Sequence, residues 1–232
     1  MTDRLWYDQQ DLTQWQAVVT AASDGRVSLD KTAFFPGGGG QPPDEGTLTW
    51  DGLTAAVAPD GLDLVVDEGV PAPAPGTVVT CQVDAKRRAL VMRTHTAMHI
   101  LTAIMGREYG AHVTGGDMRP GTGRMDFDLA EVSPTFREDV LVWFDAEVAA
   151  DHPVTVEYLD PSDFDAATMV HTAENLVPEG LDRIRLVRIG DLDVQADGGT
   201  HVASTGQVGR IELAKVENKG RGHRRVRLTL VE

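Results

Sequence analysis

Residues 84–110, with the sequence DAKRRALVMRTHTAMHILTAIMGREYG, separate two parts of the chain that differ in pattern. Asp84 is a suitable N-cap, and Gly106 or Gly110 can end a helix, so this stretch is predicted to be the first long helix. Upstream, short runs alternate or cluster in polarity between Gly, Asp and Pro turn residues, as strands do. These runs are 27–30, 46–50, 62–66 and 77–83. We therefore expect a small β-barrel at 1–83 and a second domain at 84–232.

The second domain mixes helical and strand-like patterns. Ser133 and Pro134 predict the N-cap and first position of another helix. Its apolar side chains recur at every fourth position, at Phe136, Val140, Phe144 and Val148. Strand-like runs follow at 154–158, 184–189, 209–216 and 224–231, with a short helical piece near 161–171. The expected fold class is α+β, an N-terminal barrel followed by a domain with helices and a mostly antiparallel sheet.

Composition is that of an ordinary globular protein. Of the 232 residues, 41% are hydrophobic and 25% charged, enough for a proper core. No apolar run approaches the roughly 18–20 residues of a membrane helix, and no secretory leader is visible. The single cysteine, Cys81, cannot form an intrachain disulfide. We expect a cytoplasmic protein without a membrane partner.

Charge is unevenly distributed. The formal net charge is −15, yet residues 215–232 carry six basic and two acidic side chains and are +4, which leaves −19 for the rest. Such a basic segment on an acidic body is either a solvated pair of strands or a local RNA-binding surface. The candidate phosphate contacts are Lys215, Lys219, Arg221, Arg224, Arg225 and Arg227, with a further basic run at Lys86, Arg87 and Arg88.

His95-Thr96-Ala97-Met98-His99 places two histidines four residues apart, on one face of the predicted helix. They are either metal ligands or ordinary histidines. Thr96 stands where zinc peptidases have their general-base glutamate, so peptidase chemistry is not expected.

Asp197-Gly198-Gly199-Thr200-His201 offers an oxygen and a nitrogen ligand. Together with the histidine pair, these make four donors of types that zinc accepts. The alternative is a plain turn in which the two glycines supply positive φ and His201 begins a strand.

The stretch 34–42 contains four consecutive glycines, Gly37 to Gly40. It lacks the spacing of a P-loop or of a dinucleotide fingerprint. It is either a hairpin tip or a loop that must approach something closely. Thr32 and Gln41 flank it and offer a hydroxyl and an amide to a polar substrate.

These three features occur together in the AlaX family, and the chain resembles its medium-sized members. These are free-standing alanyl-tRNA editing proteins related to the editing domain of alanyl-tRNA synthetase. The matching segments are 32–42, 93–99, 123–128, 195–202 and 216–220.

The resemblance implies trans-editing, in which the ester of tRNA(Ala) mischarged with serine, and in some members glycine, is hydrolysed. It places His95, His99 and His201 on zinc-ligand positions. Thr32 falls on the serine-sensing hydroxyl and Gln41 closes the Gly-Gly-Gln loop, so we expect both in catalysis. Expected substrate-binding positions are Gly38, Gly39, Gly40, Gly198, Gly199 and Thr200.

Asp197 departs from the family, which has cysteine there. The carboxylate either completes a zinc site of three histidines and one aspartate, more tolerant of other divalent metals, or points away and leaves a position open to water. We expect the first, with water attacking the ester directly and no covalent intermediate. ATP is not expected to be needed, since the length leaves no room for an activation domain.

Two rival hypotheses belong to other classes. The change from cysteine to aspartate is compatible with a degenerate tRNA-binding module that has lost its metal. The same site is also compatible with a metal-dependent hydrolase of a small ester or amide.

Overall fold

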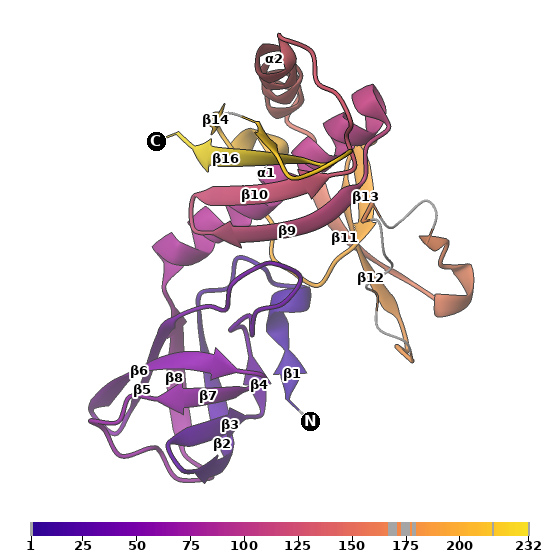
Figure 1. Ribbon diagram of the computed structural model, residues 1–232. Coiled ribbons are helices and arrows are strands. Elements are labelled where there is room, and N and C mark those ends of the chain that lie inside the picture. The colour runs from indigo at the N-terminus through magenta and orange to yellow at the C-terminus, as the bar shows by residue number, and fades with distance from the viewer. Residues whose placement is uncertain (1, 167–170, 173–176, 178–179, 215, 232) are drawn as a thin grey trace. The chain divides into compact units, whose positions relative to one another are not determined.

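The computed structural model describes residues 2–166, 171–172, 177, 180–214 and 216–231 (Figure 1). The chain divides into two compact units, Met1–Leu90 and Val91–Glu232. None of the helices among the described residues combines the length and the apolarity needed to cross a membrane.

The first unit is built on a closed barrel of six antiparallel strands in the order β2-β3-β7-β6-β5-β8. Alternating residues of the strands point inward, as Trp15, Ala17 and Val19 do in β2, and fill the interior. A short parallel pair, β1 and β4, accompanies the barrel. The strands are β1 (Asp3–Arg4), β2 (Gln14–Ser23), β3 (Arg26–Leu29), β4 (Lys31–Thr32), β5 (Gly46–Trp50), β6 (Leu53–Asp60), β7 (Asp63–Val66) and β8 (Val78–Val83), with a 3-10 turn at Leu5–Tyr7.

In the second unit, the described residues form α-helices packed with antiparallel sheets (Figure 1). One sheet has the order β14-β16-β10-β9, with β15 also pairing with β16, and the other has the order β11-β12-β13. Most of α1 and the buried face of α2 share one hydrophobic core with these sheets. The helices are α1 (Ala85–Tyr109), which begins in the first unit, and α2 (Phe136–Ala149). The strands are β9 (Val113–Arg119), β10 (Thr122–Phe127), β11 (Val154–Leu159), β12 (Ile184–Ile189), β13 (Asp193–Ala196), β14 (Ile211–Leu213), β15 (Glu217–Asn218) and β16 (Arg224–Leu230).

The architecture confirms the expected α+β fold with an N-terminal barrel. The predicted start of α2 was wrong by two residues. Its N-cap is Thr135, because Ser133 accepts the Phe136 N–H in a preceding turn and Pro134 lies within that turn. Of the helical piece predicted near 161–171, residues 161–163 form a 3-10 turn and residues 167–170 lie outside the described residues.

Candidate metal centre

Helix α1 positions the histidine pair. Asp84 caps the helix as predicted, since its carboxylate accepts the N–H of Arg87 at 3.0 Å. The helix ends before Gly110, which has a φ of +63°. His95 and His99 lie one turn apart on its buried side and are 5% and 7% exposed.

The loop that follows β13 brings Asp197 and His201 to the same place. His201 stacks on His95 with ring centroids 4.2 Å apart, and its centroid lies 4.7 Å from that of His99. The Asp197 carboxylate lies 3.0 Å from Nε2 of His201 and 3.7 Å from Nε2 of His95. His95, His99, Asp197 and His201, here named the His/Asp group, offer four donor atoms within 4.8 Å of one another.

The conformation of this loop orients the Asp197 carboxylate. Neither Gly198 nor Gly199 has a positive φ, so the plain left-handed turn is absent. Instead Asp197 accepts the N–H of Gly199 at 2.8 Å, and Nη1 of buried Arg185 donates to the Asp197 carbonyl at 2.7 Å. Thr200 is fully buried. These bonds hold the Asp197 side chain toward the histidines.

Nδ1 of His201 and Nδ1 of His99 each have an outer partner. Thr96 Oγ1 lies 3.1 Å from Nδ1 of His201 and accepts the N–H of Val202 at 3.3 Å. Asp193 Oδ2 lies 3.2 Å from Nδ1 of His99. In both rings Nε2 is then the nitrogen left for an ion, which is the arrangement typical of metal-bound histidines.

Electrostatics leaves most of the group in the state that binds a cation. Burial, reinforced by the neighbouring histidines, lowers the pKa of His95 well below its usual value. Burial likewise lowers the pKa of His201 to about 4, against the pull of Asp197. Burial would raise the pKa of Asp197, but electrostatic interaction with His95 and the hydrogen bond with His201 hold it well below its usual value. For His99 burial is outweighed by Asp193, which raises its pKa.

The glycine-rich loop lies in the first unit and ends in a tight turn. Gly38 and Gln41 exchange two backbone hydrogen bonds of 3.0 Å each. Gly39 and Gly40 between them have φ of +59° and +85°, which explains why glycine is needed at both positions. The flanking Thr32 and Gln41 side chains are each 3% exposed, and Thr32 Oγ1 accepts the N–H of Phe34 at 3.1 Å.

A buried ion pair anchors this loop. Arg88, 1% exposed, pairs with Asp44, 3% exposed. The guanidinium also donates to the carbonyls of Ala33 and Gln10, and Asp44 accepts the N–H of Phe35 at 2.6 Å. The expectation that Arg88 contacts phosphate was therefore wrong, because its charge is used inside the unit.

Known proteins match this chain over nearly all of its length. It is 31% identical over 244 residues to the alanyl-tRNA editing protein AlaX-M of Saccharolobus solfataricus, a match that covers 99% of both chains. The chain belongs to the AlaX-M family. The AlaX-M protein of Methanosarcina acetivorans is 30% identical, with full coverage of both.

The chain also resembles part of a larger protein. It is 33% identical over 233 residues to the alanine–tRNA ligase of Haloquadratum walsbyi, and it spans about a quarter, 24%, of that ligase. The family described as the threonyl and alanyl tRNA synthetase second additional domain matches residues 184–227. That segment contains both Asp197 and His201.

The predicted RNA-contacting residues differ in how far their charges are already used by other groups of the protein. Arg225 makes two 2.7 Å bonds to Asp126 of the adjacent strand and is held on the sheet. Arg224 donates to the carbonyl of Ala130 and to Asn218. Two members of the segment, Lys219 and Arg221, have exposed side chains in the turn before β16. Lys215 lies outside the described residues.

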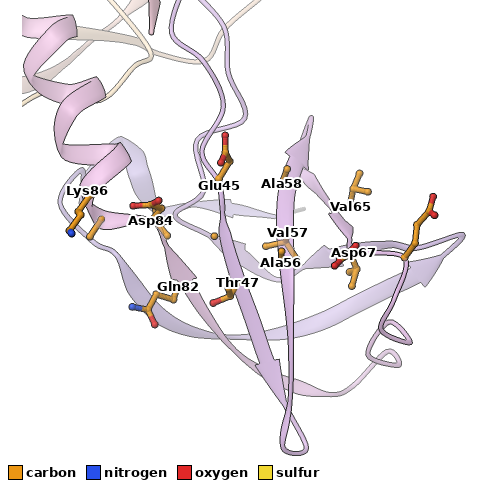
Figure 2. A pocket seen from close by; sticks show the side chains of 15 residues that line it. Glu45, Thr47, Ala56, Val57, Ala58, Val65, Asp67, Gln82, Asp84 and Lys86 are labelled. Atoms are coloured by element: carbon orange, nitrogen blue, oxygen red, sulfur yellow. The ribbon is translucent and has the colours of Figure 1, made fainter. Parts of the chain in front are cut away.

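A groove on the first unit contains none of the predicted catalytic, substrate-binding or metal-binding residues, and Lys86 is the one candidate phosphate contact that lines it. It is an open groove of about 1120 Å³, lined by β5, β6, β7, β8 and the start of α1 (Figure 2). Its charged lining residues are Glu45, Asp67, Glu68, Asp84 and Lys86. Four acids against one base make this groove a poor surface for a phosphate backbone.

Neither Asp193 nor His171 was predicted from the sequence as part of the site. The Asp193 side chain is completely buried, and its two oxygens lie 3.2 Å from Nδ1 of His99 and 3.0 Å from Nδ1 of His171. The available signal was an acidic residue four positions before Asp197, at the first position of a short strand.

Proposed function

We propose that this protein is a metal-dependent aminoacyl-tRNA deacylase that removes serine from mischarged tRNA(Ala). The observation that carries the proposal is the His/Asp group, in a chain that matches editing proteins from end to end. Glycine on the same tRNA is the second substrate to be tested.

The donor set fits a zinc ion. Three imidazole nitrogens and one carboxylate oxygen satisfy its preference for four nitrogen, sulfur or oxygen ligands. Asp197 would replace a thiolate, and because its oxygen is the harder ligand, the site should also accept other divalent metals. When bound, such an ion supplies the positive charge that stabilises negative charge developing on the ester.

The reaction transfers one acyl group to water. The water oxygen forms a bond to the carbonyl carbon, the bond to the terminal ribose oxygen breaks, and that oxygen takes up a proton. Cys81 is unsuited as a nucleophile, because burial raises the pKa of its thiol to about 12. Direct attack by water is therefore the proposed route.

Discrimination between serine and alanine is assigned to Thr32. Its hydroxyl already accepts one backbone hydrogen bond and keeps its own proton to donate. A hydroxyl that hydrogen-bonds the serine side chain is left unpaired when alanine is bound. Hydrolysis of the correctly charged alanyl-tRNA is therefore disfavoured. The amide of Gln41 and the backbone N–H groups of Gly39 and Gly40 are proposed to bind the aminoacyl end beside it.

The decisive experiment is deacylation of tRNA(Ala) charged with serine, glycine or alanine, with metal content measured on the same preparation. His95→Ala should lose both bound metal and serine release. His112→Ala is the matched control, because that histidine is 61% exposed and lies outside the His/Asp group. Retained tRNA binding without any release would favour the degenerate module, and cleavage of small esters that added tRNA does not inhibit would favour the small-molecule hydrolase.

Thr32→Val tests the serine-sensing role. Loss of one hydrogen bond that leaves a buried hydroxyl unsatisfied costs about 1–3 kcal/mol, or roughly 5–150-fold in serine release. Thr32→Ser keeps the hydroxyl and should stay near the wild-type rate. Equal rates for the valine and serine variants would assign discrimination elsewhere.

Contacts to the tRNA are assigned to the C-terminal basic segment. Lys219 and Arg221 are exposed, so replacing each with alanine should weaken tRNA binding and lower its salt slope by about 1. Arg225 should act mainly through the sheet, since Asp126 holds its guanidinium. An unchanged salt slope in a variant lacking Lys219, Arg221 and Arg224 would show that the segment is only solvated surface.

A further inference from the structure

Asp193 is a buried carboxylate with a hydrogen-bond donor on Oδ2 and a histidine ring in ion-pair contact with Oδ1. Oδ2 accepts a 2.9 Å hydrogen bond from Nε2 of Gln195, and Nδ1 of His171 lies 3.0 Å from Oδ1. The residue opens β13, where it pairs in register with Ile189 of β12. The orientation of the carboxylate is thus fixed by groups other than His99.

His99 meets this carboxylate through Nδ1, at 3.2 Å. An ionised carboxylate can only accept hydrogen bonds, so Nδ1 of His99 must carry the proton. A neutral imidazole has one N–H and one lone pair, and the lone pair is therefore on Nε2. That nitrogen is the one available to the other three members of the His/Asp group.

We propose that Asp193 is a positioning residue, which fixes the ring orientation and tautomer of His99 so that Nε2 binds the metal. This inference rests on the proposed metal-dependent function and deepens it. Outer partners of this kind typically change metal affinity by 10–100-fold when they are removed.

The test compares zinc binding by the full chain and by Asp193→Asn, using competition with a chromogenic chelator. The asparagine amide keeps the size of the side chain but can turn either its oxygen or its NH₂ group toward the His99 ring. The side chain at position 193 then no longer enforces one tautomer of His99. We expect a 10–100-fold weaker zinc affinity. Asp191→Asn is the matched control, because it makes the same change two residues earlier at an exposed position and should bind zinc like the wild type.

A second measurement does not depend on the variant folding. In the zinc-loaded wild-type protein, nitrogen-15 NMR of labelled histidine should show His99 protonated on Nδ1, its signal being assigned by its loss in His99→Gln. Protonation on Nε2 would overturn the proposal.

The outcomes separate the two levels of inference. Zinc uptake by the wild type with equal affinity in Asp193→Asn overturns the positioning role and leaves the proposed function standing. No zinc uptake by the wild type overturns both the positioning role and the metal dependence.

Discussion

Replacing Arg88 by alanine should lower the free energy of unfolding of the barrel unit more than replacing a solvent-exposed residue does. The guanidinium donates hydrogen bonds to Asp44 and to the carbonyls of Ala33 and Gln10, and it is 1% exposed. With alanine at this position, the Asp44 carboxylate and the two carbonyls lose this donor, and the negative charge of Asp44 is left buried without its ion-pair partner. Removal of one partner of a buried ion pair costs about 3–5 kcal/mol, since the remaining charge is uncompensated.

Urea unfolding monitored by tryptophan fluorescence would measure this loss. Three of the four tryptophans, Trp6, Trp15 and Trp50, belong to the first unit, so the signal reports mainly on the barrel. Lys86→Ala is the neighbouring control, because Lys86 is exposed at the start of the same helix. A surface substitution of this kind usually changes stability by about 0.5 kcal/mol or less.

The double variant Arg88→Met with Asp44→Leu removes both charges together. It should recover a large part of the lost stability, because no unpaired charge remains. An Arg88→Ala protein that unfolds at the wild-type urea concentration would refute the assignment of a buried, anchoring ion pair.

Three further predictions concern other parts of the chain. Asp197→Cys should bind zinc more tightly than the wild type in chelator competition, because thiolate is the softer ligand, and weaker binding would show that the loop is built for a carboxylate. Asp126→Asn should cost about 1–3 kcal/mol near neutral pH, because it breaks the two-bond ion pair with arginine. That arginine lowers the pKa of Asp126 in the folded protein. The difference in the free energy of unfolding between wild type and variant, measured in urea, should therefore be present above the unfolded pKa of about 3.9 and shrink as the pH falls below it. A difference that does not depend on pH would contradict the pairing. Gly46→Ala should cost about 3 kcal/mol or more in thermal unfolding, since its Cβ would lie 2.1 Å from the Gln82 carbonyl oxygen, whereas Gly69→Ala meets nothing and should be tolerated.

The features that the sequence predicted well depend on local chemistry. The cap at Asp84 fixes the start of α1, and of the two predicted ends, Gly106 and Gly110, the second is correct; both signals act on the backbone of their own turn. The spacing of His95 and His99 needs only a helix to place them on one face. Strands with clear turn residues, such as β5, were also found.

The features that it did not predict depend on partners far away in the sequence. Arg88 reads as one of three exposed cations until Asp44, 44 residues earlier, is placed beside it. Asp193 reads as an ordinary strand-edge acid until His99 lies against it. The strand β2 was missed although its local signals are present, since Gln14–Ser23 alternates between buried and exposed positions and the turn residues Asp24 and Gly25 follow it directly.

The four donors of the His/Asp group come from two segments about a hundred residues apart; Thr96 and His201, which touch, are separated by 105 positions. Closing so long a loop costs chain entropy before any contact repays it, so such contacts form late in folding. Before that closure, α1 presents only two histidines to an ion. An ion that requires all four donors thus binds the folded second unit and not its folding intermediates. Its binding free energy adds to the stability of that unit, and loss of the ion makes unfolding easier.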